Sequence, residues 1–204
     1  MNVCCLGDRL SVERIVCESK CLDSYYSTGS IQSHMELIVG YTLDQLSDIE
    51  LIRDVAKRYC RGVDRLDEAE MKSAYWPDAT DDHGTFVGNA WEFAEHCMVG
   101  HLRWRSTNHC IFNHLIELDA GGDYARGEIY NVSYMLQKDA DVLDTWHGRY
   151  LDLYEKRDDE WRIIERVCVH EYTKSETVSP MQIDSARFRQ GEFDRPAEGR
   201  LIGP

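Results

Sequence analysis

Long hydrophobic runs are missing from this sequence. No apolar stretch approaches the roughly 18 residues that a membrane-spanning helix needs. The N-terminal residues also lack a basic segment followed by a long apolar run, which a secretory signal requires. We therefore expect a cytoplasmic protein that does not use a membrane as a partner.

Basic residues are scarce relative to acidic ones. Lys and Arg number 23 against 37 Asp and Glu, and the formal net charge is −14. Because phosphate binding depends on surface Lys and Arg, this balance argues against DNA, RNA and anionic membrane surfaces as partners. Apolar residues make up 43% of the 204 residues, which is enough for the core of one ordinary domain.

The common cofactor and metal motifs are absent as well. The sequence has no GxGxxG or GxxxxGK[ST] loop for a nucleotide, no GxSxG nucleophile turn, and no HExxH or CxxC pair for a metal. The eight cysteines would form a disulfide framework only in a secreted protein, so we expect those in apolar segments to be buried free thiols. We predict neither a metal nor a cofactor.

Both ends of the chain differ in composition from its middle. Residues 1–40 hold four cysteines without sustained periodicity, so we expect a poorly structured leader or a start codon assigned too early, with Met35 as the true start. Residues 173–204 are polar and contain three of the four prolines, which predicts a mobile C-terminal tail. The domain should then span residues 41–172.

Three helices are predicted in the first half of the domain. Ser47 and Glu50 form a capping box ahead of apolar residues that recur at helical spacing as far as Val63. A short second helix fits residues 68–75, and the Trp-Pro-Asp sequence that follows should end it. After a strand or hairpin at 79–87, a third helix fits residues 88–102.

Beyond residue 102 the hydrophobic period changes from helical to two. Four long strands are predicted at residues 107–118, 124–137, 145–156 and 161–172, with hairpin turns at residues 119–123 and 157–160. Helices followed by consecutive antiparallel strands predict an α+β fold in which the helices pack on one face of a curved sheet.

Asp64 is the first candidate for chemistry. It lies on the apolar side of the first helix, four residues after Cys60. A carboxylate facing a core is costly unless it is paired, hydrogen-bonded or protonated. The alternative is a helix-end residue that turns to solvent near Arg61 or Arg65, and the pattern alone favours neither.

His109 is the second candidate, at the start of the first long strand. It should share a face with Ile111, Asn113 and Leu115, and a lone strand histidine is more often a core residue than a catalyst. His114 should point to the opposite face because strand side chains alternate. The two histidines are therefore not expected to bind one metal.

Aromatic side chains are plentiful along the domain. Several, including Trp76 and Tyr134, could line an apolar pocket for a small hydrophobic molecule, which is our central expectation. Trp146, Tyr150 and Tyr154 alternate along one strand. They face either the inside of the domain or a surface that associates with another copy of the chain, and strand alternation alone cannot separate the two.

Five short segments give these features a familiar order. They are Arg58–Asp64 (RYCRGVD), Trp76–Ala79 (WPDA), Ser106–His109 (STNH), Gly148–Asp152 (GRYLD) and Trp161–Arg166 (WRIIER). Together they span about two thirds of the chain. In order and spacing they resemble the NTF2-like superfamily, and more narrowly its SnoaL-like group, which includes scytalone dehydratase, bile-acid dehydratase, lindane dehydrochlorinase, ketosteroid isomerase and some polyketide cyclases.

The resemblance implies a fold and a set of site residues. The fold is a cone, in which three N-terminal helices pack on a strongly curved antiparallel sheet around an apolar cavity. Asp64 and His109 match the Asp–His dyad of the dehydratase branch, and Tyr59 matches a recurring tyrosine. Contacts to substrate would come from Trp76, Asn131, Tyr134 and His170. The second histidine of scytalone dehydratase has no counterpart on residues 124–137, which leaves the assistance to the leaving group open.

The resemblance also implies an activity. We expect a cofactor-independent lyase that eliminates water or a halide, or cleaves a carbon–carbon bond, on a hydrophobic aromatic or polycyclic molecule. One alternative is an isomerase or cyclase in which Asp64 alone moves the proton. Another is a non-catalytic binding or subunit-assembly module. In each case a homodimer or homotrimer is expected.

Overall fold

We describe the protein from a computed structural model, which covers residues 40–179 and 181–188. The unit that begins at Leu43 contains all the described helices and strands. The predicted leader lies outside the described residues except for Gly40, and so does most of the predicted tail. No helix among these residues is long and apolar enough to span a membrane.

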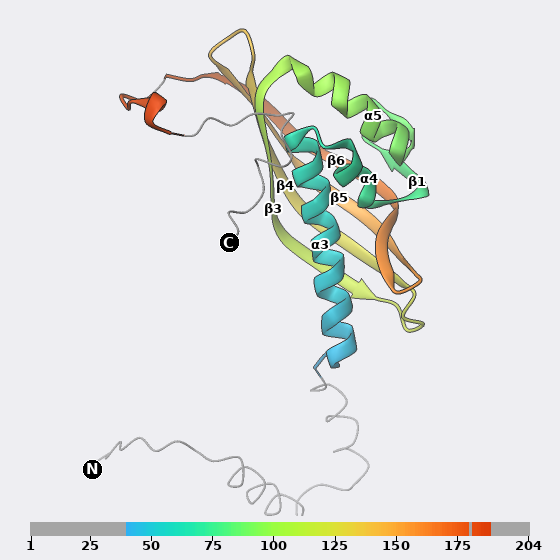
Figure 1. Cartoon of the computed structure of the whole chain (residues 1–204). Helices are drawn as coiled ribbons and strands as arrows, with labels where there is room; N and C mark the ends of the chain where they lie inside the picture. The colour runs from blue at the N-terminus through green and yellow to red at the C-terminus, as the bar shows by residue number, and fades with distance from the viewer. Residues whose placement is uncertain (1–39, 180, 189–204) are drawn as a thin grey trace, which may run out of the picture. The chain divides into compact units, whose positions relative to one another are not determined.

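Three helices and a six-stranded sheet make up this unit (Figure 1). The helices are α3 (Leu43–Arg65), α4 (Glu68–Ser73) and α5 (Ala90–Gly100), and a short 3-10 helix, η2 (His101–Arg103), follows α5. The strands are β1 (Tyr75–Asp82), β2 (Val87–Asn89), β3 (Trp104–Leu118), β4 (Tyr124–Gln137), β5 (Val142–Arg157) and β6 (Glu160–Thr177). A 3-10 turn, η3, covers Ser185–Arg187.

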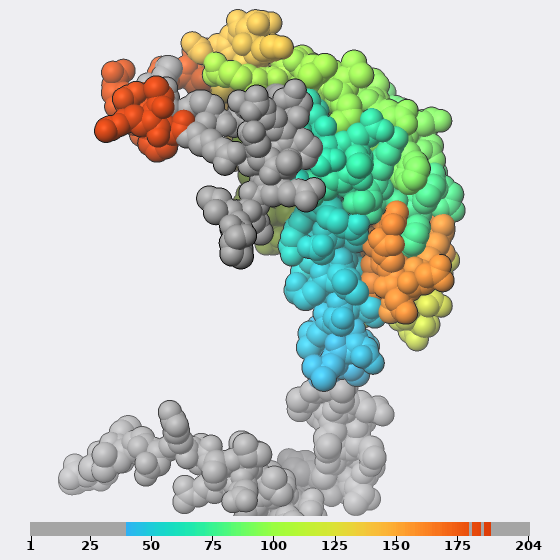
Figure 2. Space-filling model, viewed as in Figure 1, coloured from blue at the N-terminus to red at the C-terminus, as the bar shows by residue number. Residues whose placement is uncertain are grey.

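The predicted α+β architecture is confirmed. Strand order is β2-β1-β6-β5-β4-β3, and the four long strands pair antiparallel as neighbours. One pairing differs from the prediction, because β1 runs parallel to β6. Figure 1 shows the helices together on one face of the curved sheet, and Figure 2 shows them as a continuous layer. We call the face under this layer the inner face.

The helix α3 starts one turn earlier than predicted. Because it begins at Leu43, Ser47 lies inside the helix and the predicted capping box is wrong. Asp44 in the new first turn places a negative charge near the positive end of the helix dipole. Asp48 has a structural role instead, since its carboxylate accepts hydrogen bonds from the Trp161 indole at 2.8 Å and from Lys156 at 3.1 Å.

The second helix is shorter than predicted and lies against the first. α4 ends at Ser73, so Tyr75 and Trp76 belong to strand β1. Gly62 allows the close contact between α3 and α4, because a Cβ atom there would lie only 2.4 Å from the backbone nitrogen of Met71. This close packing fixes the C-terminal turn of α3, which carries Asp64.

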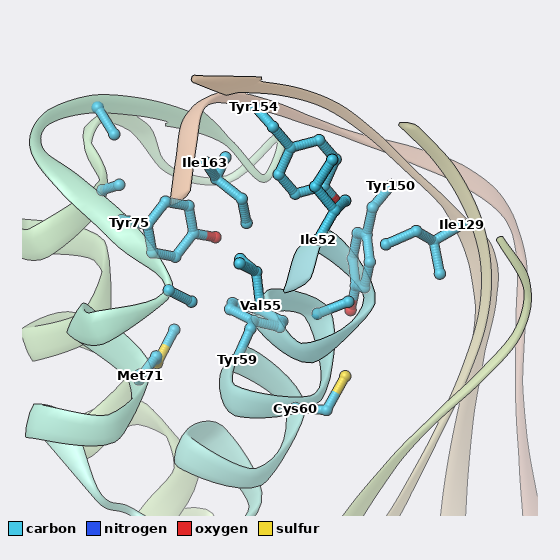
Figure 3. Packing of buried hydrophobic residues seen from close by; sticks show 14 of the residues in the cluster. Ile52, Val55, Tyr59, Cys60, Met71, Tyr75, Ile129, Tyr150, Tyr154 and Ile163 are labelled. Atoms are coloured by element: carbon cyan, nitrogen blue, oxygen red, sulfur yellow. The ribbon is translucent and has the colours of Figure 1, made fainter. Parts of the chain in front are cut away.

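The core fills the space between α3 and the sheet (Figure 3). Apolar residues of α3 at helical spacing, among them Ile52, Val55 and Tyr59, meet Ile129, Tyr150 and Tyr154 from the strands. Tyr150 and Tyr154 are almost fully buried here. Their alternation therefore reflects the inner face, and they do not form an outer interface.

A bulge in β3 changes which side chains face inward. The register between β3 and β4 shifts between Ile111 and His114, so His109 pairs with Ser133 and His114 pairs with Ile129 on the same face. The prediction that His114 lies opposite His109 is wrong because a bulge inserts an extra residue and resets the alternation. For the same reason Leu115 faces outward.

Strand β6 is longer than predicted and continues to Thr177, so the first residues assigned to the tail belong to the sheet. The C-terminal end of β6 pairs with the start of β5, where Val142 lies opposite Thr177. Polar side chains are compatible with this end of the strand because the residues there are exposed.

Candidate functional site

Asp64 lies in the last turn of α3, at a helix end built to stop abruptly. Leu66 adopts the left-handed conformation (φ 49°), and the Asp67 N–H donates to the Gly62 carbonyl at 2.9 Å. This is the Schellman pattern, in which glycine is the usual residue at the left-handed position. A carboxylate near this end faces the negative pole of the helix dipole, so it needs donors from elsewhere.

Strand β3 supplies those donors. Nδ1 of His109 lies 2.6 Å from Oδ1 of Asp64, the His109 backbone N–H donates to Oδ2 at 2.8 Å, and the Thr107 hydroxyl donates to Oδ1 at 2.9 Å. Burial would raise the pKa of Asp64, but the hydrogen bonds from His109 and Thr107 and the charge of the imidazole outweigh it, so the pKa is lowered. Asp64 is therefore a carboxylate held by strand β3, and the alternative of a solvent-facing residue is wrong.

The His109 ring is fixed through one nitrogen only. With Nδ1–H directed at Asp64, the proton-free nitrogen is Nε2, and no described residue forms a hydrogen bond with it. The side chains of His109 and Asp64 are 9% and 16% exposed, respectively. Such an imidazole can accept a proton from a molecule placed against Nε2.

His101 stacks on His109 with ring centroids 5.9 Å apart. Burial, followed by the nearby charge of His109, lowers the pKa of His101 to about 3. Nδ1 of His101 is buried and has no hydrogen-bond partner among the described residues. His101 therefore stays neutral at ordinary pH and does not add a second positive charge beside His109.

Tyr59 stands beside the dyad on the same helix as Asp64. Its ring meets the His109 ring edge-on, with centroids 6.5 Å apart. Its hydroxyl lies 3.2 Å from Nε2 of His83. Figure 3 shows Tyr59, Tyr75 and Tyr150 converging from α3, β1 and β5.

His83 is a site candidate that was not predicted from the sequence. Asp81 and His83 are two residues apart at the end of β1, so their side chains share a face, and Nδ1 of His83 contacts Oδ1 of Asp81. The Tyr75 hydroxyl donates to Oδ2 of Asp81 at 2.6 Å. The Asp-x-His spacing within the predicted hairpin was the signal that could have revealed this second pair.

Two predicted substrate contacts lie on the inner face with the dyad. Asn131 is buried and pairs in register with Ile111, two residues from His109 along β3, and its Oδ1 accepts a hydrogen bond from the Ser133 hydroxyl at 2.9 Å. His170 pairs with Gly148 and lies against the Trp146 ring, with centroids 6.1 Å apart. Gly148 is required there, because a Cβ atom would lie 2.2 Å from the Trp146 ring.

The other two predicted contacts do not reach the dyad. Trp76 follows Tyr75 along β1 and is a partly buried residue that packs against the hydrophobic core. Its indole donates to the Glu155 carbonyl at 3.0 Å, and the guanidinium groups of Arg157 and Arg162 lie 4.8 and 4.7 Å from its ring centre. Tyr134 is adjacent to the inward-facing Ser133 and lies on the outer face, 38% exposed. Neither residue forms a described hydrogen bond or ring contact with Asp64 or His109, so a role of either in substrate binding stays a prediction.

A surface hollow lies on the outer face of the sheet. Its volume is about 540 Å³, and its lining combines apolar residues such as Leu115, Leu151 and Val167 with charged ones such as Arg126 and Glu128. It contains neither Asp64 nor His109, so it is not the apolar pocket that we expected around the dyad. That pocket stays a prediction.

Comparison with known proteins agrees with this architecture. The helices and the curved sheet define the NTF2-like, or cystatin-like, class of fold, and a protein of unknown function from Nostoc punctiforme described as cystatin-like aligns with a TM-score of 0.52 at 17% identity, covering 65% of this chain and 96% of its own. Within that class, the model of the SnoaL-like domain matches residues 44–167, more than half of the chain. The protein belongs to the SnoaL-like family.

Solved structures give more distant similarities. A hexachlorocyclohexane dehydrochlorinase of type 2 aligns at 22% identity with a TM-score of 0.61, covering 69% of this chain and 99% of its own. A protein from Novosphingobium aromaticivorans described as a putative scytalone dehydratase aligns at 16% identity with a TM-score of 0.59, covering 66% and 91%. These identities establish the fold alone. A search of curated proteins finds no match.

Proposed function

We propose that this protein is a cofactor-independent lyase that acts on a hydrophobic aromatic or polycyclic small molecule. In this proposal Nε2 of His109 removes a proton from a carbon atom of the substrate. The electron pair of that C–H bond forms a double bond, and a hydroxyl or halide leaves the neighbouring carbon. The observation that carries the proposal is that Asp64 holds His109 through Nδ1 and leaves Nε2 without a described partner.

Asp64 supports the proton transfer in two ways. Its contact with Nδ1 fixes the ring tautomer, and its negative charge stabilises the imidazolium that forms when Nε2 takes the proton. The backbone bond from His109 and the bond from Thr107 keep the carboxylate in place during this change. A positioned base of this kind contributes about 10²–10⁴-fold to a rate.

The same hydrogen bonds argue against Asp64 as a lone proton shuttle. Both of its oxygens already accept hydrogen bonds from strand β3, and its pKa is lowered. A carboxylate with a lowered pKa is a weak base, because general base catalysis is most effective when the pKa lies near the working pH. The isomerase alternative is therefore less well supported than the lyase.

The test uses a probe that needs only a positioned base. 5-Nitrobenzisoxazole loses a C–H proton, its N–O bond breaks, and the coloured nitrophenolate that forms can be followed by absorbance. His109→Ala and Asp64→Asn should slow this ring opening by about 10²-fold or more. Loss of water from a panel of aromatic and steroid-like alcohols, followed by mass spectrometry, extends the test to elimination.

Matched controls separate the dyad from general damage. His147→Ala removes a histidine that stacks on Tyr172 away from the dyad, and Asp54→Asn removes an exposed carboxylate from α3. Both should turn over like the wild type. Equal rates for wild type and His109→Ala would refute the lyase. Loss in Asp64→Asn with full activity in His109→Ala would favour the isomerase.

A further inference from the structure

Tyr59, which lies beside the dyad, also contacts a second Asp–His pair formed by Asp81 and His83. The Asp81 side chain is fully buried, and its two oxygens are occupied by Nδ1 of His83 and the Tyr75 hydroxyl. The His83 ring stacks on Phe93 with centroids 4.1 Å apart and an angle of 23°. This stacking covers one face of the imidazole with an apolar ring.

The turn after β1 fixes His83 from its backbone side. Its N–H donates to the Phe86 carbonyl at 2.9 Å, its carbonyl accepts from Thr85 at 2.8 Å, and Gly84 takes a positive φ of 72°. The ring is thus held by its backbone, by Asp81 and by Phe93. Together these three restraints direct Nε2 of His83 at the Tyr59 hydroxyl.

Tyr59 connects the two pairs. Its ring centroid lies 6.4 Å from that of His83 and 6.5 Å from that of His109, and its hydroxyl lies 3.2 Å from Nε2 of His83. The two imidazoles therefore differ in one respect. Nε2 of His109 has no partner among the described residues, whereas Nε2 of His83 is joined to a phenol.

We propose that Asp81, His83 and Tyr59 form a proton-donating relay that serves the leaving group of the reaction initiated at His109. This inference rests on the proposed lyase function and adds its acid half. Tyr59 is the group that touches the leaving atom, and His83 and Asp81 are positioning residues that act through it. The substrate class implied is one whose leaving group is a poorly departing oxygen, such as a hydroxyl.

The C–H proton moves to Nε2 of His109, and the C–H electron pair becomes the new double bond. The leaving oxygen departs with the electrons of its own bond and takes the Tyr59 proton, so a hydroxyl leaves as water. Tyr59 takes a proton from Nε2 of a protonated His83. The Nδ1–H group of His83 keeps its hydrogen bond to the Asp81 carboxylate during this transfer. Afterwards His109 releases its proton to solvent and His83 regains one.

The surroundings of Tyr59 explain why it needs such a relay. Burial raises the pKa of Tyr59 well above its usual value, and only the Arg166 guanidinium, 4.2 Å from the ring centre, acts in the opposite direction. A phenol with a raised pKa does not persist as a phenolate at ordinary pH. Donation becomes feasible when a proton arrives from His83 as the first one leaves.

Two probes with different leaving groups test the relay. The nitro group of 5-nitrobenzisoxazole stabilises the departing phenolate, so this probe depends little on an acid. Unsubstituted 1,2-benzisoxazole releases a more basic phenolate and depends on an acid more strongly. His83→Gln and Tyr59→Phe should each slow the unsubstituted probe by about 10²-fold and the nitro probe by only a few-fold. His109→Ala should slow both probes by similar factors.

A double variant shows whether the two residues act as one unit. In a relay, Tyr59→Phe combined with His83→Gln should be no slower than either single variant, because each already breaks the same path. Tyr59→Phe keeps the ring under Arg166 and so tests the relay even if His83→Gln is poorly folded. His147→Gln, on the outer face, is the matched control and should leave both rates unchanged.

The possible results distinguish a failure of the proposed relay from a failure of the proposed lyase function. Equal loss on both probes in His83→Gln and Tyr59→Phe, or additive effects in the double variant, would overturn the relay while His109-dependent turnover persisted. Turnover that does not change in His109→Ala would overturn the lyase and the relay with it. A loss that grows with the basicity of the leaving group, only in the relay variants, supports both.

Discussion

Asp64 of helix α3 and Asp152 of strand β5 are carboxylates that each bind a basic side chain. Asp152 holds Arg166 through two hydrogen bonds of 2.6 and 2.7 Å, and both side chains are fully buried. Its Oδ2 also accepts the Tyr154 hydroxyl at 2.7 Å. Asp64 instead holds His109, and that pair keeps some exposure and a nitrogen without a described partner.

The two pairs differ in whether the basic side chain can exchange a proton, and this property distinguishes a structural pair from a chemical one. Arg166 cannot give up its proton in a protein, and its guanidinium lies over the rings of both Tyr59 and Tyr150, 4.2 Å from each ring centre. His109 can change its protonation state, and its environment leaves room for that change. Burial and hydrogen bonding alone would have ranked Arg166 first, whereas the capacity to exchange a proton ranks His109 first.

The largest expected effect on stability comes from breaking the structural pair. Arg166→Met should cost about 3–5 kcal/mol in the free energy of unfolding, because it leaves the Asp152 carboxylate buried without its partner. Urea unfolding measures this loss. Arg149→Met, which breaks partly exposed pairs with Glu128 and Glu171, should cost at most about 1 kcal/mol.

Replacing both members of the structural pair sharpens the same point. Asp152→Leu with Arg166→Met should recover most of the stability lost in the single variant, because no charge is then left buried alone. If the double variant is less stable than Arg166→Met, the pair contributes more than mutual charge compensation. The Asp152–Arg166 pair could then not be described as a purely structural counterpart of the Asp64–His109 pair.

The next effect is a dependence of stability on pH. Burial lowers the pKa of His114 to about 4, with the charges of Arg53 and Arg166 acting in the same direction and Asp152 opposing. An unfolded histidine has a pKa of about 6.5, so between these values the unfolded chain binds a proton that the folded chain does not. Stability should therefore fall as the pH drops, by about 1.4 kcal/mol per pH unit for this residue.

His114→Gln isolates that contribution. Urea unfolding at several values between pH 6.5 and 4 should show a shallower loss of stability in the variant than in the wild type. His101, with its pKa lowered to about 3, adds a loss of the same sign that His114→Gln does not remove. Identical slopes for wild type and His114→Gln would show that His114 is not held neutral in the fold.

The sequence predicted the architecture well, because periodicity reports directly on elements. Strand β4 has its predicted bounds, and the four long strands and three helices are present. The errors come from local geometry that periodicity does not encode. The bulge in β3 reversed the expected face of His114, and a helix start one turn earlier removed the capping box at Ser47.

The site was predicted unevenly for the same physical reason. Asp64 and His109 lie 45 residues apart and meet as the resemblance implied. Tyr134 lies on the outer face because a single step along a strand sends a side chain to the other face, and Trp76 packs against the core without a described contact to the dyad. Asp81 and His83 were missed because two polar residues at a strand end usually belong to a turn, and only the tertiary contact with Tyr59 gives them a direction.

The smallest effect distinguishes the donors around Asp64. Thr107→Val keeps the shape of a buried side chain and removes the hydroxyl that donates to Oδ1 at 2.9 Å. Two bonds from His109 still hold the carboxylate, so the ring opening of 5-nitrobenzisoxazole should slow by only about 5–10-fold, the equivalent of one hydrogen bond of about 1 kcal/mol. Thr145→Val is the matched control, since its buried hydroxyl has no hydrogen-bond partner in the described part of the chain and lies on the face of Tyr134. It should leave the rate unchanged. A loss in Thr107→Val as large as that in His109→Ala would mean that the hydroxyl, rather than the imidazole contact, keeps Asp64 in place.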